Sequence, residues 1–211
     1  MKILCFGDSI TDMGRDCKPD SFDPWDKGYG YPYVLTSKFS EEDPSKHQII
    51  NRGISGNRVV DLYARIKCDV WNLEPDVLSI LIGVNDVWHE MLAQNGVDLE
   101  RYERIYRMLI EDTKKVLPDL KIILLEPFIL PGNATVGNEE RFEEVKRYAS
   151  AVRRFAQDCG CEFVPLQARF DEAAKLYGAE KILYDGVHPT VAGSTLIANE
   201  WLKVFKTKVA K

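Results

Sequence analysis

A serine near the start of the chain is the first residue with the chemistry of a nucleophile. Ser9 ends the sequence Gly7-Asp8-Ser9, directly after a short apolar run that is typical of a β-strand. A serine at this position stands at the carboxyl edge of a sheet, where open α/β folds bind their ligands. Gly-Asp-Ser is equally an ordinary turn sequence, because glycine permits unusual backbone angles while Asp and Ser bond nearby backbone groups. Ser9 is therefore a candidate nucleophile that needs a base from elsewhere in the chain.

His188 is the histidine best placed to serve as that base. It follows Asp185 by three positions, across the glycine turn of the sequence DGVHP. A carboxylate at this spacing can hold the imidazole Nδ1–H while Nε2 faces a nucleophile. A lone histidine more often caps a helix or packs in a core, and that interpretation is kept for His47 and His89, to which we assign no role.

The elements that must position these side chains alternate along the whole chain. Apolar runs predict strands that begin near residue 3 and at 47–51, 77–82, 121–126 and 162–166. Helical spacing of apolar residues predicts helices at 33–39, 59–71, 99–117, 142–156, 168–176 and around 197–205. Crossovers of this length permit parallel pairing. We predict one domain over residues 1–211, a three-layer α/β/α sandwich around a five-stranded parallel sheet.

Three polar turns follow three of the expected strands, at residues 7–9, 53–57 and 83–86. Because the carboxyl ends of parallel strands share one edge of a sheet, these turns should converge although they are far apart in the sequence. A polar loop over 15–30 is long for a compact domain and is expected to overhang the same edge.

The overall composition excludes several classes of protein. The 211 residues are 45% hydrophobic and 29% charged, and the net charge of −5 comes from interspersed signs without a basic stripe, so nucleic acid is not an expected partner. No run of 18 apolar residues and no signal-like amino terminus occur, so we expect a cytoplasmic protein without membrane association. The five cysteines lack the paired spacing of a zinc site, and neither a metal nor a cofactor is expected.

Four motifs together resemble the sequence blocks of the SGNH, or GDSL-type, hydrolases. They are GDSIT around Ser9, RGISGN from Arg52, GVND from Gly83 and DGVHP from Asp185, in the order of the family. Within that superfamily, the longer phrases NRGISGN, IGVNDVW and DGVHPTVAG are most similar to bacterial acetylxylan or acetyl-xylooligosaccharide esterases, which resemble platelet-activating-factor acetylhydrolase-like enzymes. The resemblance implies a flavodoxin-like fold and a serine esterase that removes small acyl groups, with acetyl expected, from a sugar hydroxyl.

The same resemblance implies a role for each motif. Ser9 attacks the ester carbonyl, His188 takes the serine proton, and Asp185 orients the imidazolium. The oxyanion hole is formed by the backbone N–H groups of Ser9 and Gly53 and by the side-chain amide of Asn85. Gly53 remains equally compatible with a turn glycine of positive φ. The residues expected to contact substrate are Asp8, Asn57, Tyr29 and Trp88, with surface exposure or core packing as the alternative, while Asp8 and Asp86 are also expected to brace their loops.

Two other functions stay open. A lysophospholipase or thioesterase on the same scaffold would need a longer acyl channel, whereas a carbohydrate-binding protein would keep the fold without turnover. The presence of every motif residue favours catalysis. The expected partner is a small acyl ester, in the first place an acetylated oligosaccharide, and because family relatives include assemblies, a homo-oligomer is compatible with the sequence.

Overall fold

The computed structural model describes residues 1–17 and 24–210, and within them the strands form one parallel sheet. Five strands are hydrogen-bonded in the order β2-β1-β3-β4-β5. Their bounds are β1 Lys2–Gly7, β2 Gln48–Gly53, β3 Val77–Leu81, β4 Lys121–Leu125 and β5 Glu162–Val164. The predicted five-stranded parallel sheet is confirmed.

The central strands are buried on both sides, which explains their nearly continuous apolar sequence. Every residue of β3 is buried, including Ser79. The Ser79 hydroxyl accepts a hydrogen bond of 3.0 Å from the indole N–H of Trp201, itself fully buried. The buried hydroxyl in the centre of the sheet thus has a hydrogen-bond partner on the helix that carries Trp201, as is usual for a buried polar group.

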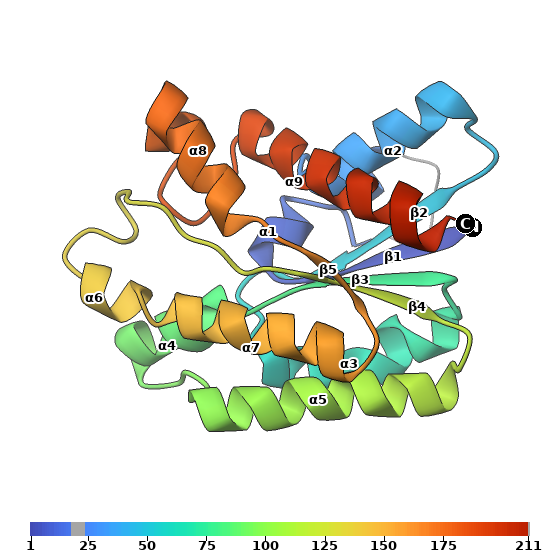
Figure 1. The fold of residues 1–211 in the computed structure, drawn as a ribbon, viewed down its shortest axis with the longest axis horizontal. Coiled ribbons are helices and arrows are strands. Elements are labelled where there is room, and N and C mark those ends of the chain that lie inside the picture. Colours follow the sequence, from blue (N-terminus) through green and yellow to red (C-terminus); the bar gives the residue numbers. More distant parts are fainter. Residues whose placement is uncertain (18–23, 211) are drawn as a thin grey trace.

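Helices cover both faces of the sheet, as Figure 1 shows. One face carries α2 (Tyr31–Glu42), α8 (Gln167–Tyr177) and α9 (Val191–Val204), and the other carries α3 (Val59–Asp69), α5 (Leu99–Val116) and α7 (Val145–Asp158). The three-layer sandwich predicted from the alternating pattern is therefore confirmed. Among the described helices, none combines the length and apolarity that a membrane-spanning segment requires.

Shorter elements complete the chain. They are α1 (Ser9–Asp12), the 3₁₀ turns Pro24–Lys27, Trp71–Leu73 and Ala179–Lys181, α4 (Val84–Ala93), α6 (Glu139–Phe142) and a final π-helical turn Phe205–Val209. The sequence predicted a polar turn at 83–86, but the structure begins α4 at Val84, with only two residues between it and the end of β3 at Leu81. The predicted overhanging loop at 15–30 lies partly outside the described residues.

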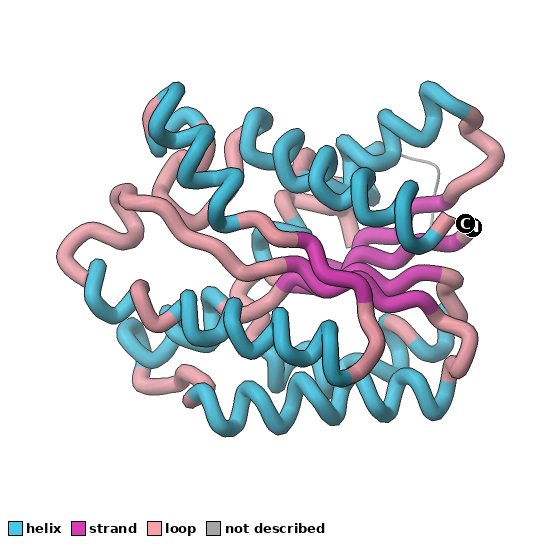
Figure 2. Tube along the Cα trace, viewed as in Figure 1, coloured by secondary structure: helices cyan, strands magenta, loops and turns pink. Residues whose placement is uncertain are grey.

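The segments that leave the carboxyl ends of the strands gather at one edge of the sheet. In Figure 2 the long loop between β4 and α6 extends beyond this edge on the left. Two of its residues bond the segment that carries the candidate base: the Leu130 N–H donates to the Gly186 carbonyl (2.9 Å) and the Ala134 N–H to the Asp185 carbonyl (2.8 Å). The loop after β4 therefore fixes the turn between α8 and α9 in place.

Candidate active site

Ser9, His188 and Asp185 form a continuous chain of hydrogen bonds. Ser9 Oγ lies 2.9 Å from His188 Nε2, and His188 Nδ1 lies 2.7 Å from Asp185 Oδ2. The second carboxylate oxygen, Oδ1, accepts the backbone N–H groups of Val187 (2.9 Å) and His188 (2.7 Å). The structure thus brings together the three side chains that the sequence singled out.

The serine is held at the start of a helix. Asp8 is the N-cap of α1, and its Oδ1 accepts the Ile10 N–H at 3.0 Å. Ser9 is the first residue of that helix, and its own N–H has no hydrogen-bond partner within residues 1–17 and 24–210. The first N–H groups of a helix lack intrahelical acceptors, so the Ser9 amide is free to donate to an oxyanion next to its own hydroxyl.

Asp185 is held in its ionised form. Burial alone would raise the pKa of its carboxyl, but the hydrogen bonds from the His188 backbone and ring and from the Val187 N–H outweigh burial and lower that pKa below its ordinary value. A carboxylate that stays charged stabilises the imidazolium form of His188. Asp185 is thereby suited to orient the ring during proton transfer.

Asn85 presents its amide from the first turn of α4. The side chain is largely buried, and Nδ2 donates to the Asn57 carbonyl at 3.0 Å. An amide nitrogen has two hydrogens, so one remains for a ligand after the bond to Asn57. This geometry fits the role that the sequence predicted for Asn85 in an oxyanion hole.

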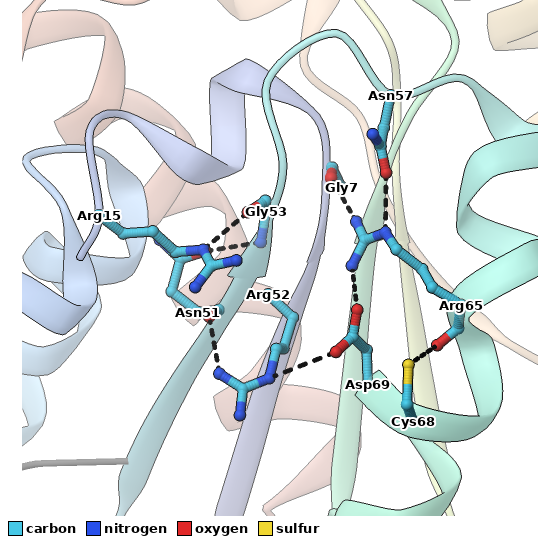
Figure 3. Close-up of polar contacts among 9 residues, drawn as sticks. All are labelled: Gly7, Arg15, Asn51, Arg52, Gly53, Asn57, Arg65, Cys68 and Asp69. Atoms are coloured by element: carbon cyan, nitrogen blue, oxygen red, sulfur yellow. Dashed lines mark hydrogen bonds and ion pairs between the residues drawn. The ribbon is translucent and has the colours of Figure 1, made fainter. Parts of the chain in front are cut away.

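The geometry contradicts the predicted oxyanion role of Gly53. Its N–H already donates to Asn51 Oδ1 at 2.8 Å, and its carbonyl accepts Arg15 Nε at 2.7 Å (Figure 3). A Cβ at Gly53 would lie 2.2 Å from the Asp12 backbone nitrogen. Gly53 is therefore a packing glycine that lets α1 approach β2, and its amide is not available to substrate.

A second glycine of the same motif has the free amide. Gly56 adopts φ +82° in the turn after β2, and its N–H has no hydrogen-bond partner among the described residues. The next residue, Asn57, receives the Asn85 amide on its carbonyl. Gly56 was missed because both glycines of RGISGN suit a tight turn, and spacing alone does not tell which amide is already bonded.

Asp8 and Asp86 are buried, and each accepts a hydrogen bond from a backbone N–H group rather than facing a substrate. Asp8 is 1% exposed, which contradicts the predicted substrate contact, and Asp86 Oδ1 accepts the Val59 N–H at the start of α3 (3.0 Å). Burial raises the pKa of Asp8 to about 7 and that of Asp86 to about 8. The expectation that both residues brace their loops is confirmed.

The chain matches a known protein family over most of its length. The model of the GDSL-like lipase/acylhydrolase family matches residues 5–196, a range that includes all four motifs. The chain belongs to this family. As a GDSL-like acylhydrolase it is a carboxylic ester hydrolase, as the sequence predicted.

Relatives of this GDSL-like hydrolase include well-matched solved structures. The chain is 35% identical over 209 residues to the acetylxylan esterase of Geobacillus stearothermophilus, covering 96% of this chain and 92% of that protein. A crystal structure of that esterase matches with a TM-score of 0.83 over 96% of this chain and 92% of the other, at 35% identity. A protein described as a GDSL-like lipase from Parabacteroides merdae matches with a TM-score of 0.91 at 38% identity, over 98% and 96% of the two chains. In the Geobacillus esterase, alanine replacements of one serine and one histidine are described as catalytic mutants.

Aromatic rings surround the histidine of this GDSL-like hydrolase. The centroid of the Trp88 ring lies 6.0 Å from that of His188, and Tyr184 stacks on His188 at 5.7 Å with an interplanar angle of 15°. Tyr184 and the predicted Tyr29 are both exposed, and the pKa of Tyr184 is raised by burial and by the neighbouring Asp185 and Tyr29. Tyr184 was not predicted, although its place directly before Asp185 was a signal.

The remaining predicted substrate residue has a different contact. The Asn57 side-chain oxygen accepts Arg65 Nε at 2.7 Å, while its carbonyl accepts Asn85. Asn57 therefore connects Arg65 to Asn85 by hydrogen bonds within the site. Among residues 1–17 and 24–210, no cluster of three or more His, Cys, Asp or Glu side chains is arranged to hold a metal ion.

Proposed function

We propose that this esterase removes acetyl groups from short acetylated oligosaccharides, with acetylated xylo-oligosaccharides as the substrate class, through a Ser9–His188–Asp185 triad. The observation that carries the proposal is the pair of contacts on His188, 2.9 Å to Ser9 Oγ and 2.7 Å to Asp185 Oδ2. These contacts supply an activated nucleophile, a base and an orienting carboxylate in the arrangement that acyl transfer requires.

In the first half-reaction, Ser9 Oγ attacks the ester carbonyl carbon and His188 Nε2 accepts the serine proton. The developing oxyanion is stabilised by the free N–H of Ser9, the remaining hydrogen of Asn85 Nδ2 and the N–H of Gly56. The tetrahedral intermediate collapses, and His188 returns the proton to the sugar alkoxide as it leaves. Preorganised donors of this kind are among the largest contributions to such catalysis.

In the second half-reaction, a water molecule takes the place of the sugar hydroxyl. His188 accepts a proton from the water as the water oxygen attacks the acetyl-enzyme carbonyl, and it then returns the proton to Ser9 Oγ. Acetate leaves and the free enzyme is restored. Asp185 carries negative charge throughout, which favours the imidazolium in both halves.

The proposed substrate class rests on the surroundings of His188. Trp88 and Tyr184 lie against the histidine ring, and the exposed Tyr29 acts electrostatically on Tyr184. Aromatic rings offer apolar faces with hydrogen-bonding edges, which suit a sugar ring. The name of the Geobacillus relative, an acetylxylan esterase, supports a sugar acetate as the ester.

The test compares peracetylated xylobiose, nitrophenyl acetate and nitrophenyl octanoate as substrates, with Ser9→Ala as the control variant. We expect turnover of the two acetyl esters and its loss in Ser9→Ala at unchanged folding. Preference for octanoate would overturn the acetyl assignment in favour of a lysophospholipase or thioesterase. A lack of turnover on all three esters, with binding of the oligosaccharide, would favour a carbohydrate-binding protein.

A further inference from the structure

A single arginine contacts two of the three turns that build the candidate active site. Arg65 comes from α3, and its side chain is 13% exposed. Its Nε donates to Asn57 Oδ1 at 2.7 Å and its Nη2 donates to the Gly7 carbonyl at 3.1 Å, as Figure 3 shows. Gly7 is the last residue of β1, and Asn57 belongs to the turn that follows β2.

Both acceptors of the guanidinium lie close in the chain to residues of the candidate active site. The Gly7 carbonyl is two residues before Ser9, so the bond to Nη2 fixes the backbone from which the nucleophile projects. Asn57 follows Gly56 in the chain, and its carbonyl accepts Asn85 Nδ2 at 3.0 Å. The same guanidinium therefore joins the nucleophile to the residues that carry the two other oxyanion donors.

The guanidinium is itself held from two further directions. Its Nη1 donates to Asp69 Oδ2 at 2.6 Å, and its carbon lies 4.3 Å from the centre of the Phe6 ring. The other Asp69 oxygen lies 3.8 Å from Arg52 Nε. A planar fork with fixed donors and a stacked face has little freedom to move. Its contacts therefore add to the backbone bond from the Ile54 N–H to the Gly7 carbonyl (3.1 Å) in holding the two turns together.

We propose that Arg65 is a positioning residue that locks the oxyanion turn at 54–57 to the nucleophile turn at 7–9. The proposal rests on the proposed roles of Gly56 and Asn85. Because Arg65 acts through other residues and touches no reacting atom, its loss should lower kcat and leave KM nearly unchanged.

The first test replaces Arg65 with methionine or lysine. Arg65→Met keeps an apolar stem near Phe6 but removes the donors, and we expect kcat on nitrophenyl acetate to fall about 10- to 100-fold, as displacement of donors by about 1 Å can do. Lysine provides a point charge without the planar fork. Arg65→Lys should therefore give an intermediate kcat.

Arg153→Met is the matched control. Arg153 also lies over an aromatic ring, with its guanidinium carbon 4.6 Å from the centre of Phe163, and it also pairs with a carboxylate, Glu126, at 3.6 Å. It belongs to α7, and its side chain is 54% exposed. We expect Arg153→Met to keep the wild-type kcat and KM.

A double-mutant cycle separates positioning from a general loss of structure. If Arg65 acts through Asn85, the variant Arg65→Met/Asn85→Ala should be little slower than Asn85→Ala alone, whereas independent effects would multiply. The pH profile of kcat/KM should keep its shape in Arg65→Met, because the contacts of His188 with Asp185 are untouched.

Three outcomes would overturn the proposal: a kcat of Arg65→Met within twofold of that of Arg153→Met, multiplicative effects in the cycle, or an increase in KM alone. If Arg65→Met does not fold, Asn57→Ala removes only the acceptor of Nε, and a kcat equal to that of the wild type would then refute the proposal. Full activity in Asn85→Ala would instead refute the oxyanion assignment, so the two failures are distinguishable.

Discussion

Replacing Asp86 with asparagine should make the fold more stable at neutral pH and change how its stability depends on pH. Asp86 is 1% exposed, its Oδ2 has no hydrogen-bond partner among the described residues, and burial raises the pKa of its carboxyl from 3.8 to about 8. The folded protein therefore keeps Asp86 protonated at a pH where the unfolded chain has lost that proton. Asparagine keeps an oxygen for the Val59 N–H and carries no titratable proton.

The sign and size of the effect follow from this pKa. The stabilising contribution of a carboxyl with a raised pKa is complete below the unfolded value of 3.8 and is lost as pH rises towards about 8. Between these values the free energy of unfolding falls by about 1.4 kcal/mol per pH unit. Asp86→Asn should therefore gain about 3 kcal/mol relative to the wild type between pH 5 and pH 7, with a plateau above pH 8.

The assay is urea unfolding at pH 5, 6, 7 and 8, with linear extrapolation to water. The difference between variant and wild type cancels the contributions of titrating groups that do not interact with Asp86, among them His47 and His89, whose pKa values are lowered by burial. Asp98→Asn is the control, because the pKa of Asp98 is lowered by the hydrogen bond from the Arg101 N–H and its replacement should shift stability equally at every pH above 5. A pH-independent difference between Asp86→Asn and the wild type would refute the reasoning.

Two further substitutions test the corrected roles of the site residues. Gly53→Ala places a Cβ only 2.2 Å from the Asp12 backbone nitrogen, so it should lower the free energy of unfolding by about 1–3 kcal/mol, measured in urea; wild-type stability would contradict the close approach of α1 to β2. Tyr184→Ala should raise KM for acetylated xylobiose about fivefold, the equivalent of about 1 kcal/mol of ring contact, whereas Tyr177→Ala on α8, which replaces another exposed tyrosine, should not. Equal KM values for these two variants would remove Tyr184 from the sugar site.

The sheet could be predicted because each strand is a short apolar run that is visible in the sequence itself. The run at 77–81 is apolar at every position but one. Such a run is typical of a strand that is covered by helices on both faces of a parallel sheet. The pairing of Asp185 with His188 could be found for a similar reason, since a single turn separates the two residues. Both features depend on neighbours in the chain.

The features that the sequence did not predict depend on contacts across the fold. Asn85 and Asp86 are typical turn residues, yet they lie buried in the first turn of α4 because Asn57 and Val59 supply their partners. The choice between Gly53 and Gly56 depends on which amide Asn51 occupies. Arg65 and Asp69 alone have the spacing of an ion pair on a solvated helix face, and the long-range acceptors of the guanidinium, on the Gly7 carbonyl and the Asn57 side chain, appear only in the folded chain.

The two contacts of His188 differ greatly in the length of chain that they close. Its bond to Asp185 spans three residues and belongs to a local turn, whereas its bond to Ser9 spans 179 residues. Contacts of such high sequence separation form only after a large loss of chain entropy. During synthesis, a chain that has emerged only as far as residue 184 already contains every strand and the nucleophile but has no base. With the proposed triad, we expect ester hydrolysis to begin only when the segment that carries Asp185 and His188 has docked. The onset of activity in a refolding or translation experiment should then report the completion of the whole fold.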